Sequence, residues 1–253
     1  MLEPALNFTP RGQRDKIPAV ASLPATSIVV PTFREVEALP DLIERVARVR
    51  AEHGSLQELL IVDDDSRDGT EDLIAKRPEP WLKLIVRKQD RGLSQAVLAG
   101  LRAARGDILV VMDADLSHPP EVIAHMQQAI VDGADFVVGS RYVPGASTAE
   151  DWGLFRFLNS QVATLLARPL TKISDPMSGF FALPRAVFER AEEPSPLGYK
   201  IGLELLVRCH ARNVKEIPIH FANRTRGESK LTAKQQLLYL QHLARLYRFK
   251  LGV

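Results

Sequence analysis

The sequence predicts an α/β fold: a single domain with a mostly parallel central sheet flanked by helices, followed by a C-terminal amphipathic helix. From Ser27 onward, short β-rich runs alternate with segments of helical period, which is typical of strand–helix units on a parallel sheet. The run Ile108–Met112 is continuously apolar and suits a strand buried on both faces. The chain has 253 residues, 45% hydrophobic and 25% charged, which fits one large globular domain.

This alternation assigns the elements in order. The expected strands are 27–30, 58–62, 82–86, 108–112 and 136–139, and the expected helices are 38–50, 70–76, 92–104 and 119–131. Beyond Arg141 the pattern loosens, as expected where a second half builds the far side of a cleft. Residues 1–26 contain four prolines and are interpreted as an irregular arm, residues 27–232 as the folded domain, and residues 233–253 as the basic amphipathic helix.

Composition excludes several classes of protein. The single cysteine, Cys209, excludes an intramolecular disulfide and a cysteine-cluster metal site. No apolar run reaches the length of about 18 residues that a membrane-spanning helix needs. The N-terminal arm lacks the compact apolar core of a secretory signal. A formal net charge of +2 does not indicate a nucleic-acid-binding protein.

Two aspartates one residue apart, Asp113 and Asp115, follow the most apolar predicted strand. In open α/β sheets ligands bind at the carboxyl ends of the strands, and carboxylate oxygens are ligands that Mg²⁺ and Mn²⁺ prefer. The alternative is that the pair only ends the strand and caps the helix that Pro119 and Pro120 begin. On the first interpretation, this pair is a divalent-metal site.

Polar residues also follow the other predicted strands. Glu35 follows the first strand, a cluster of aspartates that includes Asp65 follows the second, and Arg91 precedes a helix after the third. The aspartate cluster can also be a turn and helix cap, and the basic segment can be a solvated turn. If the strands are parallel, however, all these side chains lie at one edge of the sheet together with Asp113 and Asp115, which favours a ligand site there.

Six segments carry a resemblance to a known family. They are SIVVPTFREVEALP, IVDDDSRDGT, DRGLSQAVLAGLRAARGDILVVMDADLSHPPEVI, VVGSRYVPG, SDPMSGFFAL and RGESKLT. The chain resembles the dolichyl-phosphate and polyprenyl-phosphate mannose synthases, which are family 2 glycosyltransferases, over about residues 27–232. This resemblance implies a nucleotide-diphosphosugar transferase fold, a GDP-mannose donor, Mg²⁺ or Mn²⁺, and a polyprenyl phosphate acceptor.

The resemblance also implies roles for individual residues. Asp113 and Asp115 match the metal and diphosphate motif, while Ser117 takes a position where some relatives carry a longer glutamine. The matches to donor-binding positions are Pro31, Glu35, Asp65, Asp113, Ala114, Asp115, Arg226 and Lys230. The matches to acceptor-phosphate positions are Arg141, Arg156 and Ser160. Asp175 is expected to position the sugar or to brace an arginine, and Glu204 is expected close behind the site.

The chemistry of the reacting groups agrees with these roles. Loss of a nucleoside diphosphate develops negative charge, which a divalent cation and arginines stabilise. A phosphate monoester has a second pKa of about 6, so the acceptor is already ionised at neutral pH and needs no base. We therefore interpret His118 as a helix-start residue. The predicted reaction is an inverting transfer in which Asp115, Arg141 and Arg156 act directly.

The C-terminal residues 224–253 hold seven Lys or Arg against one Glu, interleaved with leucines at near-helical spacing. A basic amphipathic helix can lie in a membrane interface, which predicts a peripheral protein on the cytoplasmic face of a membrane. The alternatives are that its apolar side packs on the domain or on a small membrane-protein partner.

Three other functions stay open at this point. One is glucose transfer from UDP-glucose to polyprenyl phosphate, and another is transfer to a soluble or polysaccharide acceptor. The third, a nucleic-acid-binding or scaffold protein, is disfavoured because the basic stretch lacks a nucleic-acid motif.

Overall fold

The computed structural model describes residues 23–148, 154–192, 194, 197–222 and 233–252, with the side chains of residues 154–160, 233 and 234 left outside the description. Its strands are β1 (Thr26–Thr32), β2 (Leu56–Asp63), β3 (Leu82–Val86), β4 (Ile108–Val111), β5 (Phe136–Ser140), β6 (Ser147–Thr148), β7 (Phe181–Pro184), β8 (Val214–Pro218) and β9 (His220–Phe221). Its helices are α1 (Leu39–His53), α2 (Thr70–Ala75), α3 (Leu93–Ala103), the 3₁₀ turn η1 (Pro120–Val122), α4 (Ile123–Val131), α5 (Leu154–Ala167), α6 (Arg185–Phe188), α7 (Ile201–Arg208) and α8 (Ala233–Leu251). All five predicted strands and all four predicted helices form, and the last of these helices begins as η1.

The central sheet has seven strands in the order β3-β2-β1-β4-β7-β5-β8. β1, β2, β3 and β4 are parallel to one another, as are β5 and β8, whereas β7 runs antiparallel between β4 and β5. The prediction of a mostly parallel sheet is confirmed. The expected size of about five strands was too small, because β7 and β8 lie in the half of the chain where the pattern loosens.

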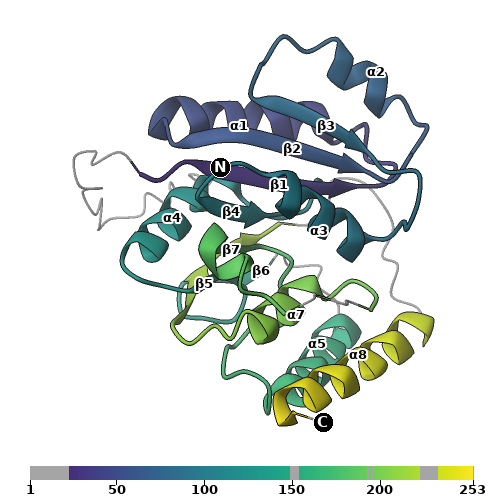
Figure 1. Cartoon of the computed structure of the whole chain (residues 1–253), viewed down its shortest axis with the longest axis vertical. Helices are drawn as coiled ribbons and strands as arrows, with labels where there is room; N and C mark the ends of the chain where they lie inside the picture. The colour runs from purple at the N-terminus through teal and green to yellow at the C-terminus, as the bar shows by residue number, and fades with distance from the viewer. Residues whose placement is uncertain (1–22, 149–153, 193, 195–196, 223–232, 253) are drawn as a thin grey trace, which may run out of the picture.

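Helices cover both faces of the sheet, giving three layers (Figure 1). On one face, α1 and α4 pack against residues such as Ile28, Val30 and Ile61. On the other face, α3, α7 and α8 pack against residues such as Val29 and Val62. Gly100 of α3 allows a close approach, since a Cβ there would lie 2.9 Å from the Val62 side chain. The two cores fix the strands whose carboxyl ends form the site described below.

α5 and α8 lie side by side at the lower end of the molecule in Figure 1. The Tyr239 hydroxyl of α8 donates a hydrogen bond of 2.7 Å to the Ala163 carbonyl of α5. Tyr239, Leu243 and Leu246 of α8 are buried against the domain. No helix in the described part of the chain is long and apolar enough to cross a membrane.

Candidate active site

The carboxyl ends of β1, β2 and β4 converge at one edge of the sheet. Thr32 at the end of β1 pairs with Asp63 at the end of β2, and Val29 pairs with Val111 of β4. Immediately after these strands, Arg34, Asp65 and Leu116 all have positive φ angles, of 62°, 54° and 61°. Such angles are unfavourable for residues other than glycine and tend to be retained where a site needs a fixed geometry. This edge therefore carries both polar side chains and backbone strain.

The Asp113–Asp115 segment is held by short local hydrogen bonds. The Ser117 hydroxyl donates to Asp115 Oδ1 at 2.6 Å, and the Ser117 amide donates to the same oxygen at 3.1 Å. The Asp113 amide donates to His118 Nδ1 at 3.0 Å. Asp115 is buried, while the Asp113 side chain is 33% exposed. Ser117 thus orients the Asp115 carboxylate, and one carboxylate of the pair opens toward solvent.

His118 is locked into the wall of the site. Its ring stacks on Phe180 with a centroid separation of 5.2 Å and contacts Phe221 edge-on at 5.6 Å. Burial lowers the pKa of His118 below its usual value, and the nearby Asp113 and Asp115 charges only partly oppose this. Because a neutral ring accepts the Asp113 amide hydrogen at Nδ1, the residue supports the Asp113–Asp115 segment, and the 3₁₀ turn η1 begins two residues later.

The donor set fits a divalent ion that the protein shares with a bound phosphate. Within the described residues, no group of three or more histidine, cysteine or acidic side chains forms a complete metal cage. Mg²⁺ commonly binds proteins through one or two carboxylates and takes its other ligands from substrate phosphate and water. Gly179 leaves room beside Asp113, since a Cβ there would lie 3.5 and 3.6 Å from the two carboxylate oxygens. Asp113 and Asp115 are therefore the residues that would hold the ion.

The three consecutive aspartates after β2 have different partners. Asp63 accepts hydrogen bonds from the Thr32 hydroxyl at 2.9 Å and the Ser66 amide at 2.8 Å. Asp64 accepts from the Gly92 amide at 2.6 Å and from Arg87. Asp63 and Asp64 thus join the strand ends to each other.

Asp65 takes a different position from these two neighbours. Its carboxylate pairs with Arg67 at 2.9 Å and with Arg91. The hydrogen bond from Arg67 holds the pKa of Asp65 below its usual value. The structure therefore brings Asp65 and Arg91, both expected at this edge of the sheet, together as an ion pair.

Arg141 and Asp175 form a buried bidentate pair on the other side of Asp113. Arg141 Nε and Nη2 each lie 2.7 Å from an Asp175 oxygen, and the Arg141 amide donates to Asp175 Oδ2 at 3.1 Å. Burial alone would lower the pKa of Arg141, but the Asp175 carboxylate raises it above the usual value. The expectation that Asp175 braces an arginine agrees with this geometry.

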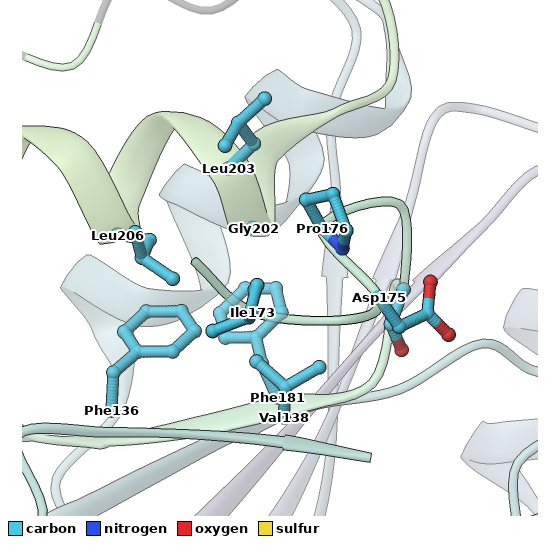
Figure 2. A pocket seen from close by; sticks show the side chains of 10 residues that line it. Phe136, Val138, Ile173, Asp175, Pro176, Phe181, Gly202, Leu203 and Leu206 are labelled. Atoms are coloured by element: carbon cyan, nitrogen blue, oxygen red, sulfur yellow. The ribbon is translucent and has the colours of Figure 1, made fainter. Parts of the chain in front are cut away.

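The loop that carries Asp175 is itself fixed from two sides. Glu216 of β8 accepts the Ser174 and Asp175 amides at 2.7 and 3.1 Å. Figure 2 shows Asp175 and Pro176 at the edge of a small pocket whose other walls are apolar side chains of the sheet and of α7. Phe136, Phe181 and Leu206 fill that side of the loop. The packing therefore presents the Asp175 carboxylate in one orientation.

Lys200, at the start of α7, is a residue to which the sequence assigned no role. Its Nζ donates a hydrogen bond of 3.0 Å to the Met177 carbonyl, in the loop between Asp175 and Gly179. Burial, followed by the charge of Arg141, lowers the pKa of Lys200 to about 8. The segment around it drew attention only for Glu204, and no local pattern distinguishes Lys200 from a surface lysine.

Glu204 of α7 contacts the C-terminal helix. It is buried and pairs with His242 of α8 at 2.6 Å and with Arg208 at 2.5 Å. These contacts join α7 to the C-terminal helix. The expectation that Glu204 lies close behind the site stays a prediction.

The remaining predicted site residues fall into two groups. Pro31, next to last in β1, pairs with Val62; Glu35 follows the strand and is half-buried, and Ala114 is buried between Asp113 and Asp115. Arg156 and Ser160 lie on α5, but their side chains are outside the described residues, as are Arg226 and Lys230 entirely.

The chain leaves the described part of β9 close to the metal motif. The Ala222 amide donates to the Ser117 carbonyl at 3.3 Å, directly before the segment that contains Arg226 and Lys230. Ala222, the last described residue before that segment, therefore contacts Ser117, two residues after Asp115.

Comparison with known proteins adds to this geometry. The chain matches the profile of glycosyl transferase family 2 over residues 27–191. A dolichol-phosphate mannosyltransferase from Mycosarcoma maydis is 43% identical over 92% of this chain and 83% of that protein. A protein of the same name from Pyrococcus furiosus is 42% identical over 88% of this chain and 64% of that protein.

A solved structure resembles the fold. Glucosyl-3-phosphoglycerate synthase from Mycobacterium tuberculosis, in complex with Mn²⁺, UDP and glucosyl-3-phosphoglycerate, matches with a TM-score of 0.67 and 18% identity. The match covers 91% of this chain and 81% of that one. At this identity the likeness concerns the fold, and it confirms the predicted fold class.

Proposed function

Because this chain belongs to glycosyl transferase family 2, we propose that it transfers mannose from GDP-mannose to the phosphate of dolichol or another polyprenol. The relatives at more than 40% identity are dolichol-phosphate mannosyltransferases, and they match nearly the whole chain. One observation carries the proposal. The same edge of the sheet holds Asp113 and Asp115, of which Asp113 is partly exposed, and the buried arginine Arg141. The first suits a metal-bound diphosphate and the second suits a phosphate acceptor.

The donor occupies the ends of β1, β2 and β4 in this proposal. Pro31, Glu35 and Asp65 would face the nucleoside, and Asp113 and Asp115 would hold a Mg²⁺ or Mn²⁺ ion that binds the diphosphate. When bound, that ion offsets the negative charge that develops on the leaving diphosphate. Arg226 and Lys230 contribute further positive charge from the segment after Ala222. Ser117 keeps Asp115 oriented throughout.

The acceptor lies on the side of Arg141. A guanidinium matches phosphate with two parallel hydrogen bonds, and Asp175 fixes its plane. Arg156 and Ser160 complete the acceptor phosphate site in this proposal. An acceptor oxygen that is already ionised attacks the sugar C1 from the face opposite the diphosphate, so the anomeric configuration inverts and no side-chain base is needed.

The acceptor is a lipid, and we infer that α5 and α8 bring the enzyme to it. Both helices expose large apolar side chains: Val162 is 56% exposed, Leu165 70%, Leu237 57% and Leu240 51%. Apolar side chains with nearby cations favour contact with an anionic membrane surface. The protein would then be peripheral, on the cytoplasmic face. A small membrane-protein partner is the alternative occupant of these helices.

The transfer reaction can be tested directly. Purified protein is incubated with radiolabelled GDP-mannose or UDP-glucose, a short polyprenyl phosphate, and Mg²⁺ or Mn²⁺, with a chelator as the control. Label from GDP-mannose in the organic phase supports the proposal, whereas label from UDP-glucose changes the donor. Absence of any lipid product contradicts the assignment of the acceptor. R141K and R156K should each lower turnover, because lysine cannot form the bidentate contact.

A further inference from the structure

Lys200 has an unusual position for a lysine. Its ammonium donates to the Met177 carbonyl at 3.0 Å and lies 4.5 Å from the centroid of the Tyr199 ring. Among the described residues, no carboxylate forms a salt bridge with it. A desolvated ammonium with one carbonyl acceptor is costly unless an anion completes its surroundings.

The loop that Lys200 contacts is the one that shapes the acceptor side of the site. Met177 lies two residues after Asp175, which holds Arg141, and two residues before Gly179, which lies against the Asp113 carboxylate. Figure 2 shows this loop passing close to the first turn of α7, where Gly202 and Leu203 lie. The electrostatic neighbours of Lys200 are Arg141, Asp175 and Asp113. The ammonium therefore contacts the same loop that carries Asp175 and Gly179.

Without a bound substrate, the positive charge of Lys200 has no negative partner of its own among the described residues. The Asp175 carboxylate accepts hydrogen bonds from Nε and Nη2 of Arg141, so it is the counter-charge of Arg141 and not of Lys200. Asp113 is expected to bind a divalent ion. The positive charge of Lys200 is then left for a ligand that is itself an anion. Phosphate is the anion that the proposed reaction brings to this place.

We propose that Lys200 is a phosphate-binding residue of the active site, which contacts a phosphate oxygen of the acceptor or of the sugar-nucleotide donor. This inference rests on the proposed function and extends it to a residue outside the recognised motifs. Lysine acts here as a point charge, in contrast to the fork of Arg141. The Met177 carbonyl keeps the long side chain in place.

Two substitutions separate this role from a structural one. Lys200→Gln keeps an N–H donor for the Met177 carbonyl but loses the charge, and Lys200→Arg keeps both. We expect K200Q to raise the KM for one phosphate substrate about tenfold or more, as the loss of a charge-assisted hydrogen bond implies. K200R should restore most of the loss. Lys250→Met is the matched control, since Lys250 donates to the Pro169 and Leu170 carbonyls at 2.8 and 3.1 Å on the far end of α8.

The measurement uses GDP-mannose, Mn²⁺ and citronellyl phosphate, a short isoprenoid acceptor that needs no membrane. A raised KM for citronellyl phosphate assigns Lys200 to the acceptor, and a raised KM for GDP-mannose assigns it to the donor diphosphate. KM values that K200Q leaves unchanged for both substrates overturn the inference, as does an equal loss in K250M.

Calorimetric titration separates failure of this inference from failure of the proposed function. Wild-type protein that transfers no mannose contradicts the proposed function. In that event, the inference about Lys200 is tested by binding alone. The affinities for GDP with Mn²⁺ and for citronellyl phosphate are compared between wild type and K200Q. Weaker binding of either ligand by K200Q supports the inference, and equal binding of both refutes it. Thermal unfolding of K200Q near the wild-type temperature is expected, because removing an uncompensated charge does not weaken the fold.

Discussion

The substitution Asp175→Asn tests whether the buried ion pair positions Arg141. Asp175 is fully buried, and it accepts three hydrogen bonds from Arg141, at 2.7, 2.7 and 3.1 Å. The Arg141 side chain is only 10% exposed. Asparagine has almost the same shape, but it carries no charge and offers a single acceptor oxygen. The guanidinium would stay buried without its counter-charge.

The expected cost follows from that geometry. Removing one partner of a buried ion pair destabilises a protein by about 3–5 kcal/mol, because the other charge is left uncompensated. Asparagine keeps one acceptor, so we expect a loss near 3 kcal/mol, at the lower end of this range. Loss of the bidentate contact also frees the plane of the guanidinium. Because a small misplacement of a positioning group can cost about 100-fold in rate, we expect kcat to fall by about that factor.

The surface pair of Arg45 and Glu121 provides the matched control. It has the same bidentate geometry, with N–O distances of 3.1 and 2.7 Å, but the Glu121 side chain is 55% exposed. Exposed ion pairs contribute about 0–1 kcal/mol, so Glu121→Gln should barely change the free energy of unfolding. Urea titration measures both variants, and the mannosyl transfer assay gives kcat. If D175N lost no more stability than E121Q, or kept wild-type kcat, the argument from the buried pair would be refuted.

Three further substitutions test other parts of the site. Asp115→Asn should abolish Mn²⁺-dependent transfer while leaving the thermal unfolding temperature nearly unchanged; unaltered turnover across a Mn²⁺ titration would remove Asp115 from the metal site. Gly179→Val should raise the Mn²⁺ concentration for half-maximal activity about tenfold, because its methyl groups would press on the Asp113 carboxylate beyond a Cβ already at 3.5 Å. His242→Leu should lower the free energy of unfolding by about 1–3 kcal/mol, since it removes a buried partner of Glu204, and urea titration of the variant would contradict this if stability were unchanged.

The sequence predicted the strands well, and it placed Asp113 and Asp115 at the end of a strand, because both are local features. Continuous apolar runs such as Ile108–Met112 specify buried strands, and the residues directly after a parallel strand must lie at its carboxyl edge. Asp65, Asp113 and Asp115 were therefore expected at one edge, and they follow β2 and β4, which lie parallel on either side of β1 in the sheet. The positions of these residues relative to the predicted strands were sufficient to predict that they lie at this edge.

The second half depends on contacts between distant segments. Strand β7 enters the sheet antiparallel between β4 and β5, although it follows β5 by some forty residues. Periodicity within a segment carries no information about which neighbours it will join. The same reason explains Glu204, which pairs with His242 thirty-eight residues later. The role of Lys200 likewise depends on the turn that brings α7 to the Met177 loop.

The three aspartates after β2 show why residue type alone does not assign a role. Asp63, Asp64 and Asp65 are chemically identical, but Asp63 and Asp64 receive backbone amide hydrogens and join the strand ends. Asp65 has a φ of 54°, which turns the chain out of the strand direction and sets its carboxylate against two exposed arginines. Because those arginines are partly solvated, a ribose hydroxyl can replace one of them at small cost. The backbone angle, more than the carboxylate, thus makes Asp65 the member of the cluster that is available to a nucleoside.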